Sequence, residues 1–213
     1  MSDIDFYKDI WKKHCVSKYK DTFTNIKHII CIGDIHGDFE LLIASLKLAN
    51  VIDDNLKWKA KNTYVVQLGD QIDSYRPSPN TDNKIHTNEP KELRILLYMT
   101  YLNINAQKHN SAVISLIGNH ELMNIYNDFS YVEKEGFKEF ETFFTHKYGK
   151  TGRLIRENVF KPGNILSTLI GCTRQVIVKI NDILFVHGGI LTEVANKFSI
   201  TDINQIMAIY LFK

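Results

Sequence analysis

Three short apolar segments of this sequence each end in a glycine that is followed at once by a polar residue able to bind a metal ion. They are Ile32-Gly33-Asp34, Leu68-Gly69-Asp70 and Ile117-Gly118-Asn119, and a fourth apolar segment ends at His187. Glycine at a strand end permits a tight turn and lets the backbone approach a metal ion or a phosphate closely. In open α/β sheets, ligands collect beyond the carboxyl ends of the strands. The sequence therefore predicts that these polar side chains converge on one site.

The order of the apolar segments predicts an α/β fold. Residues 28–32, 63–68 and 112–117 have the length and composition of buried strands. Residues 41–50 and 90–108, which lie between these strands, have helical periodicity. Strands that alternate with helices indicate an α/β architecture with the strands at its centre.

The flanking segments complete this outline. Residues 175–180 and 183–187 lie on either side of an Asn181-Asp182 turn, which predicts an antiparallel pair of strands. Residues 3–19 predict an amphipathic helix, and the polar residues 75–89 predict a long exposed loop. We expect one domain over residues 1–213, of which 1–25 form a helical lead-in.

The composition excludes two classes of partner. A formal net charge of +2 is too small to indicate nucleic acid or an anionic membrane. No segment approaches the roughly 20 apolar residues that a membrane span needs, and the N-terminal residues lack a signal-peptide core. The three cysteines, Cys15, Cys31 and Cys172, are scattered and odd in number, which is not the pattern of a disulfide framework. We therefore expect a soluble protein of a reducing, cytoplasmic compartment.

The candidate ligand set has a defined chemistry. Carboxylate, amide and imidazole ligands without a thiolate suit Mn, Fe or Zn rather than an iron–sulfur cluster. The alternative is that these residues only satisfy local hydrogen bonds at strand-end turns. Cys31 stands one position before a strand end, where we expect a small buried residue with no reactive role.

Four motifs resemble the successive signatures of the calcineurin-like metallophosphoesterases, in the phosphoprotein-phosphatase branch. They are Asp34-Ile35-His36-Gly37, Gly69-Asp70 with Asp73, Gly118-Asn119-His120-Glu121 and His187-Gly188-Gly189. Residues 160–190 are similar to the Shewanella-type phosphatases in particular. The resemblance implies an α/β fold with a β-sandwich core flanked by helices. It also implies two divalent metal ions and a hydrolase that acts on phosphoesters.

The resemblance implies a role for each motif residue. Asp34 and His36 would bind the first ion, Asp70 would bridge both ions, and Asn119 and His187 would bind the second. A pair of ions lowers the pKa of a bridging water, which attacks the phosphorus. His120 would act as general acid on the leaving-group oxygen, and Asp73 would orient His120.

The sequence departs from the family pattern in two places. The family has Arg-Gly directly after the equivalent of Asp73, an arginine that grips phosphate, whereas here the nearest arginine is Arg76. Arg76 is therefore only a tentative substrate-binding residue. The family also supplies one more metal-binding histidine downstream of His187, and this sequence ends without it. We expect that the C-terminal part of the domain is missing and that the second metal site is incomplete.

These observations predict a metal-dependent phosphatase for phosphomonoesters, with phosphorylated protein (Ser/Thr or Tyr) or a small phosphoester as the substrate. One alternative is a hydrolase of nucleotides, dinucleoside polyphosphates or nucleic-acid phosphates. The other is a catalytically impaired metal-binding or interaction protein. Three further arginines, Arg153, Arg156 and Arg174, are open to two interpretations, phosphate binding or, as we expect, solvated surface positions.

Overall fold

A parallel sheet of four strands carries most of the predicted site. The structure, a computed structural model, describes residues 20–75, 90–144 and 148–213. The sheet order is β2-β3-β4-β5, formed by His28–Ile32, Thr63–Gln67, Ala112–Leu116 and Arg174–Gln175. Every neighbouring pair in this sheet is parallel, so the carboxyl ends of β2, β3 and β4 lie along the same edge. This arrangement brings the glycine motifs together.

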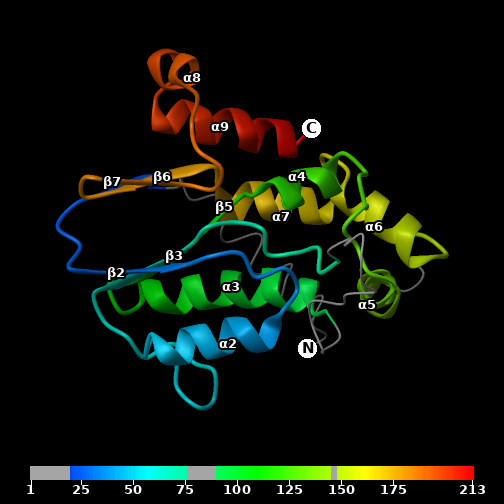
Figure 1. Cartoon of the computed structure of the whole chain (residues 1–213), viewed down its shortest axis with the longest axis horizontal. Helices are drawn as coiled ribbons and strands as arrows, with labels where there is room; N and C mark the ends of the chain where they lie inside the picture. Colours follow the sequence, from blue (N-terminus) through cyan, green and yellow to red (C-terminus); the bar gives the residue numbers. More distant parts are fainter. Residues whose placement is uncertain (1–19, 76–89, 145–147) are drawn as a thin grey trace, which may run out of the picture.

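Two helices cover one face of this sheet (Figure 1). They are α2 (Phe39–Leu48) and α3 (Glu92–Gln107), the crossover connections that follow β2 and β3. Asp38 caps α2 by accepting a hydrogen bond from the backbone amide of Leu41 at 2.8 Å. Buried Leu42, Leu46 and Met99 belong to the apolar cluster that joins the helices to the sheet.

A second, three-stranded sheet lies over the opposite face (Figure 1). Its order is β1-β6-β7, formed by Thr22–Phe23, Ile177–Ile180 and Ile183–Val186. β1 and β6 are parallel, and β6 and β7 form the predicted antiparallel pair, with Asn181 at φ 54° in the turn. An apolar cluster that includes Val66, Ile114 and Val178 contains residues of both sheets. The structure is therefore a mixed α/β fold with two packed sheets flanked by helices.

Several of the remaining helices build a third apolar cluster beyond the strand ends. They are α4 (Asn119–Ile125), α5 (Lys134–Phe144), α6 (Gly152–Phe160), α7 (Ile165–Thr173) and α9 (Ile200–Leu211). Helix α8 (Thr192–Lys197) has no buried residue and lies outside this cluster. Phe140 and Phe160 are fully buried in this cluster, together with residues of α3 and α7. Helix α6 thus packs close to the edge of the sheet where the predicted site lies.

Several expectations need correction. The predicted strand 175–180 is divided, because Gln175 pairs with β4 whereas 177–180 form β6 of the other sheet. Cys31 is exposed rather than buried, and it lies on β2, an edge strand of its sheet. Cys172 is disulfide-bonded, which sequence spacing did not reveal because a disulfide depends on approach in space.

Two predicted segments lie wholly or mostly outside the described residues. They are the lead-in helix at 3–19 and the loop at 75–89, of which only Tyr75 is described. Within the described part of the chain, we find no helix with the length and apolar character that crossing a membrane requires.

Candidate metal centre

The predicted metal ligands come from four neighbouring strand ends. Asp34 and His36 follow β2, Asp70 follows β3, Asn119 begins the helix after β4, and His187 follows β7. His36 and Asp70 have positive φ angles of 49° and 52°, which are uncommon for residues with a side chain and cluster at functional sites. The backbone amides of Ile35 and His36 both donate to the carbonyl oxygen of Asp70 at 3.0 Å. These hydrogen bonds join the turn after β2 to the turn after β3 through the backbone.

The carboxylate of Asp70 lies at the centre of the group. Its Oδ1 accepts a hydrogen bond from the backbone amide of His120 at 2.9 Å. Its Oδ2 faces the Nε2 atoms of three histidines, at 4.0 Å from His36, 3.9 Å from His120 and 3.3 Å from His187. One oxygen is therefore held by the backbone, and the other points into a ring of imidazoles.

In two of the histidines, Nδ1 contacts a backbone carbonyl oxygen. Nδ1 of His36 is 3.2 Å from the carbonyl oxygen of Ile72, and Nδ1 of His187 is 2.7 Å from that of Leu68. A carbonyl only accepts, so Nδ1 is the donor in each ring, and the neutral ring then has a lone pair at Nε2. Metal-binding histidines show this arrangement.

Asn119 approaches the same atoms. Its Oδ1 lies 2.9 Å from Nε2 of His187, which itself lies near Asp70. With the ring proton at Nδ1 of His187, three electron-rich groups face one another: Oδ1 of Asn119, Oδ2 of Asp70 and the lone pair at Nε2 of His187. A cation between them would satisfy all three, so the donor set fits a metal ion.

Two groups of three residues bring one ligand atom each within 4.8 Å of one another: His36, Asp70 and His120, and Asp34, Asp70 and His187. Two ligands that each lie about 2.1 Å from one ion are separated by roughly 3–4 Å, which matches the spacing here. Asp70 belongs to both groups, as expected of a bridging residue. Oδ2 of Asp34 lies 3.7 Å from Nε2 of His36, and Oδ1 of Asp34 lies 3.9 Å from Nδ1 of His187.

Two glycines permit this close approach. A Cβ atom at Gly118 would lie 2.1 Å from Oδ1 of Asp70, and one at Gly69 would lie 2.7 Å from the backbone nitrogen of Gly118. Gly69 also has φ +103°, a left-handed conformation that a side chain would strain. A larger residue at Gly118 would displace the central carboxylate, and one at Gly69 would push against the backbone of Gly118 and the ring of His187.

Glu121 has a structural role in this site that the sequence did not reveal. It is fully buried and accepts hydrogen bonds from the backbone amides of Gly118 (2.7 Å), Gln71 (2.8 Å) and Asp70 (3.0 Å). Burial, with a further contribution from the charge of Asp70, raises the pKa of the Glu121 carboxyl. Glu121 thus ties the turn after β3 to the turn after β4. The only sequence signal was its place in the Gly-Asn-His-Glu motif.

His120 and Asp73 form the predicted pair. Nδ1 of His120 lies 2.9 Å from Oδ2 of Asp73, and Asp73 is fully buried. A carboxylate accepts, so Nδ1 of His120 is the donor, and Nε2 faces the metal side. The ring of Tyr131 packs edge-on against His120, with the centroids 5.0 Å apart.

The expectation that three arginines are solvated is wrong for two of them. Arg156 is fully buried and Arg174 is 3% exposed, because both guanidinium groups meet internal hydrogen-bond acceptors. Arg153 is exposed as expected. Arg76, the tentative substrate-binding residue, lies outside the described residues.

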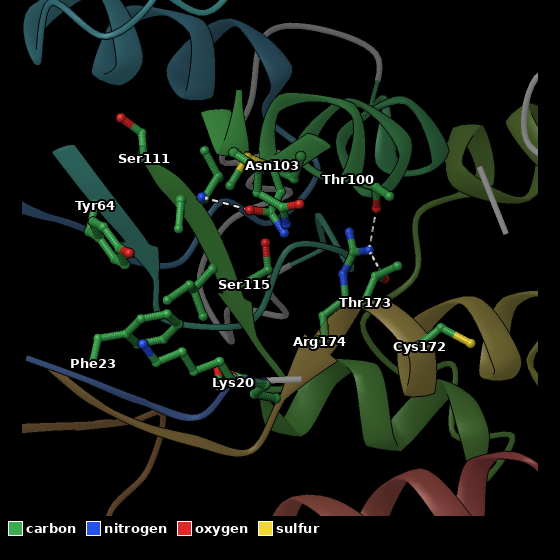
Figure 2. Close-up of a pocket in the computed structure, with 16 residues that line it drawn as sticks. Lys20, Phe23, Tyr64, Thr100, Asn103, Ser111, Ser115, Cys172, Thr173 and Arg174 are labelled. Atoms are coloured by element: carbon green, nitrogen blue, oxygen red, sulfur yellow. Dashed lines mark hydrogen bonds between the residues drawn. The ribbon is translucent and has the colours of Figure 1, made fainter. Parts of the chain in front are cut away.

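A hollow of about 310 Å³ lies apart from this centre, along the open edge of β4. Figure 2 shows Arg174 beside it, with the guanidinium turned toward Thr100 and Thr173, to which it donates hydrogen bonds. Asn103 accepts a hydrogen bond from the backbone amide of Val113 at 3.0 Å on the same side. None of the predicted metal ligands lines this hollow, so it is not the predicted site.

Two kinds of similarity link the chain to known proteins. The family model described as calcineurin-like phosphoesterase matches residues 27–212. The chain is 27% identical over 203 residues to Shewanella-like protein phosphatase 2 of Arabidopsis thaliana, covering 80% of this chain and 48% of that protein. It is 35% identical over 196 residues to Shewanella-like protein phosphatase 1 of Plasmodium berghei, covering 91% and 48%.

A solved structure shares the fold. It is a cold-active protein-tyrosine phosphatase of a psychrophilic Shewanella species, with a TM-score of 0.67 and 23% sequence identity. The similarity covers 95% of this chain and 53% of that one. The chain thus spans about half the length of the curated relatives it matches.

Proposed function

Since this chain belongs to the calcineurin-like phosphoesterase family, we propose that it is a metal-dependent phosphatase that hydrolyses phosphomonoesters. One observation carries the proposal: Oδ2 of Asp70 faces Nε2 of the two predicted ligand histidines, at 4.0 Å from His36 and 3.3 Å from His187. This spacing suits ligands that share a cation and is too long for most direct hydrogen bonds.

The ligand roles follow the motif positions. Asp34 and His36 would hold one cation, Asn119 and His187 would hold the other, and Asp70 would contact both. When bound, two divalent cations would supply positive charge that activates water and stabilises the phosphate oxygens. Manganese, iron and zinc all suit this mixture of carboxylate, amide and imidazole.

His120 would deliver the proton that the leaving group requires. Its Nδ1 is bound by Asp73 at 2.9 Å, so its Nε2 is the atom available to a leaving-group oxygen. A nearby carboxylate favours the charged form of an imidazole, which is the form that can donate from Nε2. Asp73 therefore both orients the ring and favours the proton at Nε2.

We propose phosphorylated protein as the substrate class. The support is that two relatives are named as protein phosphatases and that a structure of the same fold is titled a protein-tyrosine phosphatase. Turnover of phosphotyrosine and phosphoserine peptides, with manganese supplied, should exceed turnover of diadenosine tetraphosphate. The Asp70→Asn variant is the control for background hydrolysis of each substrate. Hydrolysis of the dinucleotide alone would replace this proposal with a nucleotide hydrolase, and no hydrolysis of any substrate would favour an impaired metal-binding protein.

The general-acid role has its own test. In a His120→Ala variant, the rate on an alkyl phosphate should fall by about 100-fold or more, with a much smaller fall for p-nitrophenyl phosphate. The reason is that p-nitrophenolate leaves without a proton. His28→Ala, which changes an exposed histidine on β2, is the control. Equal losses on both esters would count against His120 as the acid.

A further inference from the structure

Arg156 lies behind the pair of Asp73 and His120 and has no contact with the predicted metal side. It belongs to α6, and its side chain is completely buried. The three nitrogens of its guanidinium group point to three different side chains, those of Asn124, Asp73 and Glu92. Long charged side chains are almost never fully buried unless they are paired. A side chain this enclosed holds a fixed orientation.

Two of these contacts act on Asp73. Nη2 of Arg156 donates to Oδ1 of Asp73 at 2.8 Å, and Nε donates to Oδ1 of Asn124 at 2.6 Å. Asn124 in turn donates from Nδ2 to both carboxylate oxygens of Asp73, at 2.8 and 2.9 Å. The guanidinium group of Arg156 therefore binds Asp73 directly. It also holds the side-chain amide of Asn124, which itself binds Asp73.

The third contact closes a ring. Nη1 of Arg156 is 2.6 Å from Oε2 of Glu92, which is fully buried at the start of α3. Oε1 of Glu92 accepts a hydrogen bond from the backbone amide of Asp73 at 3.2 Å. Asp73 has φ +68°, a strained conformation for a residue with a side chain. Its backbone and its carboxylate are thus both held by the same pair of buried charges.

Both oxygens of Asp73 are saturated by this arrangement. Oδ1 accepts from Arg156 and Asn124, and Oδ2 accepts from Asn124 and lies 2.9 Å from Nδ1 of His120. Rotation of the carboxylate about its Cβ–Cγ bond would break several of these bonds at once. Without Arg156, Oδ1 would lose a charged donor, and the carboxylate could turn away from His120 more easily.

We propose that Arg156 is a positioning residue that fixes the carboxylate of Asp73 and thereby aims Nε2 of His120 at the leaving group. This inference rests on the phosphatase activity proposed above, because the consequence of the positioning is proton delivery. Glu92 is the counter-charge that keeps Arg156 in place. Arg156 itself touches no substrate.

The first test is spectroscopic and needs neither metal nor substrate. In protein with ¹⁵N-labelled histidine, the hydrogen-bonded Nδ1–H of His120 should give a downfield proton signal, assigned by its loss in His120→Asn. The double variant Glu92→Gln/Arg156→Met removes both buried charges together and should lose or shift this signal. Arg153→Met, an exposed arginine on the same helix, should leave it unchanged.

The second test is the dependence of rate on the leaving group. For the same double variant, hydrolysis of phenyl phosphate should fall about 10- to 100-fold more than hydrolysis of p-nitrophenyl phosphate. Arg156→Lys keeps the charge but cannot bind Asn124, Asp73 and Glu92 at once, so it should show the same bias to a smaller extent. Near-ultraviolet circular dichroism confirms that each variant is folded, and Arg156→Lys provides the test if the double variant is not.

The two proposals fail in different ways. If the wild-type chain with manganese hydrolyses neither ester, the proposed function fails, and the histidine spectra still test the positioning. If the wild-type chain is active, while the folded variants lose both esters equally and keep the His120 signal, the positioning role is overturned.

Discussion

Two neighbouring groups of residues both contain carboxylates but neutralise them differently. We call the predicted metal ligands around Asp70 the metal side, and the buried charges of Asp73, Glu92 and Arg156 behind them the network. On the metal side, the side chain of Asp34 is 48% exposed, and Oδ2 of Asp70 lies 3.3 to 4.0 Å from Nε2 of the predicted ligands His187 and His36. Behind it, the side chains of Asp73, Glu92 and Arg156 are fully buried, and their contacts are 2.6 to 3.2 Å long. The spacing of the first set suits ligands of a bound cation, whereas the second set contains a cation of its own, the guanidinium group of Arg156.

The difference has a simple electrostatic origin. A buried carboxylate needs a positive partner or several hydrogen-bond donors, because removing its hydration costs several kcal/mol. Arg156 supplies that partner inside the network. On the metal side no arginine or lysine forms an ion pair with Asp34 or Asp70 among the described residues. The metal side should therefore respond strongly to added cations, and the network should not.

The largest effect we expect is the loss of activity in Asp70→Asn. Replacing the shared carboxylate oxygen should lower metal-dependent hydrolysis of p-nitrophenyl phosphate by about 1,000- to 10,000-fold, equivalent to roughly 4 to 5.5 kcal/mol. Steady-state kinetics with manganese supplied would measure it. Asp54→Asn, a fully exposed carboxylate on the same chain, is the control. Near-normal activity in Asp70→Asn would remove the central carboxylate from the mechanism.

Arg156→Met should show the second-largest effect, on stability. Removing one partner leaves Asp73 and Glu92 buried without their cation, which costs about 3 to 5 kcal/mol in the free energy of unfolding. Urea denaturation of the metal-free protein would measure it, with Arg153→Met expected to change stability by less than about 0.5 kcal/mol. Asp70→Asn should also be nearly neutral in the same measurement. A large loss for both Asp70→Asn and Arg156→Met would abolish the contrast between the two regions.

The third expected effect is a pH dependence of stability caused by Glu139, which contacts the backbone of Glu92. Glu139 accepts hydrogen bonds from the backbone amides of Glu92 and Leu93 at 2.9 and 3.3 Å. Burial, with a smaller contribution from the charge of Glu92, raises the pKa of Glu139 from 4.5 to about 7. The folded state therefore binds this proton more tightly than the unfolded state does.

Stability should accordingly fall as pH rises through this window. The contribution of Glu139 is fully present below pH 4.5 and is lost by about pH 7, a change of about 3 kcal/mol. Glu139→Gln, which cannot ionise, should lack this part of the dependence. Urea denaturation at a series of pH values would compare the two proteins. Parallel curves for wild type and variant would show that Glu139 has an ordinary pKa.

The smallest expected effect is stabilisation of the fold by bound manganese, which should depend on the metal side and not on the network. Free manganese at 100 times its dissociation constant should raise the free energy of unfolding by about 2.7 kcal/mol, because it binds only the folded state. Asp70→Asn should abolish this gain, and Glu139→Gln should keep it. Denaturation with manganese and with a chelator would measure the difference. A gain that survives in Asp70→Asn would place the cation elsewhere.

The metal side could be predicted from the sequence, and the network could not. Asp34, Asp70 and Asn119 each directly follow a glycine at a strand end, so short-range pattern marks them. His36 stands two residues after Asp34, and His187 directly follows an apolar segment. Parallel pairing of β2, β3 and β4 then brings most of them to one edge without further information. The roles of these ligands remain predictions.

Arg156 shows why the network stayed hidden. It lies 83 residues from Asp73 along the chain, in an amphipathic helix where a solvated arginine is the ordinary expectation. Only the packing of α6 against the start of α3 and the turn after β3 turns it inward. Glu92 is equally ordinary in sequence, as an acidic residue in the first turn of a helix.

The sequence by itself indicated the family, the alternating α/β order and the candidate ligands at the strand ends, because each depends on residues that are close together in the chain. The tertiary structure alone decided that residues 175–180 divide between two sheets, that Cys172 is disulfide-bonded, and that Arg156 is buried against Asp73. These features depend on contacts between distant segments, and burial reverses the ordinary preference of a charged side chain for water.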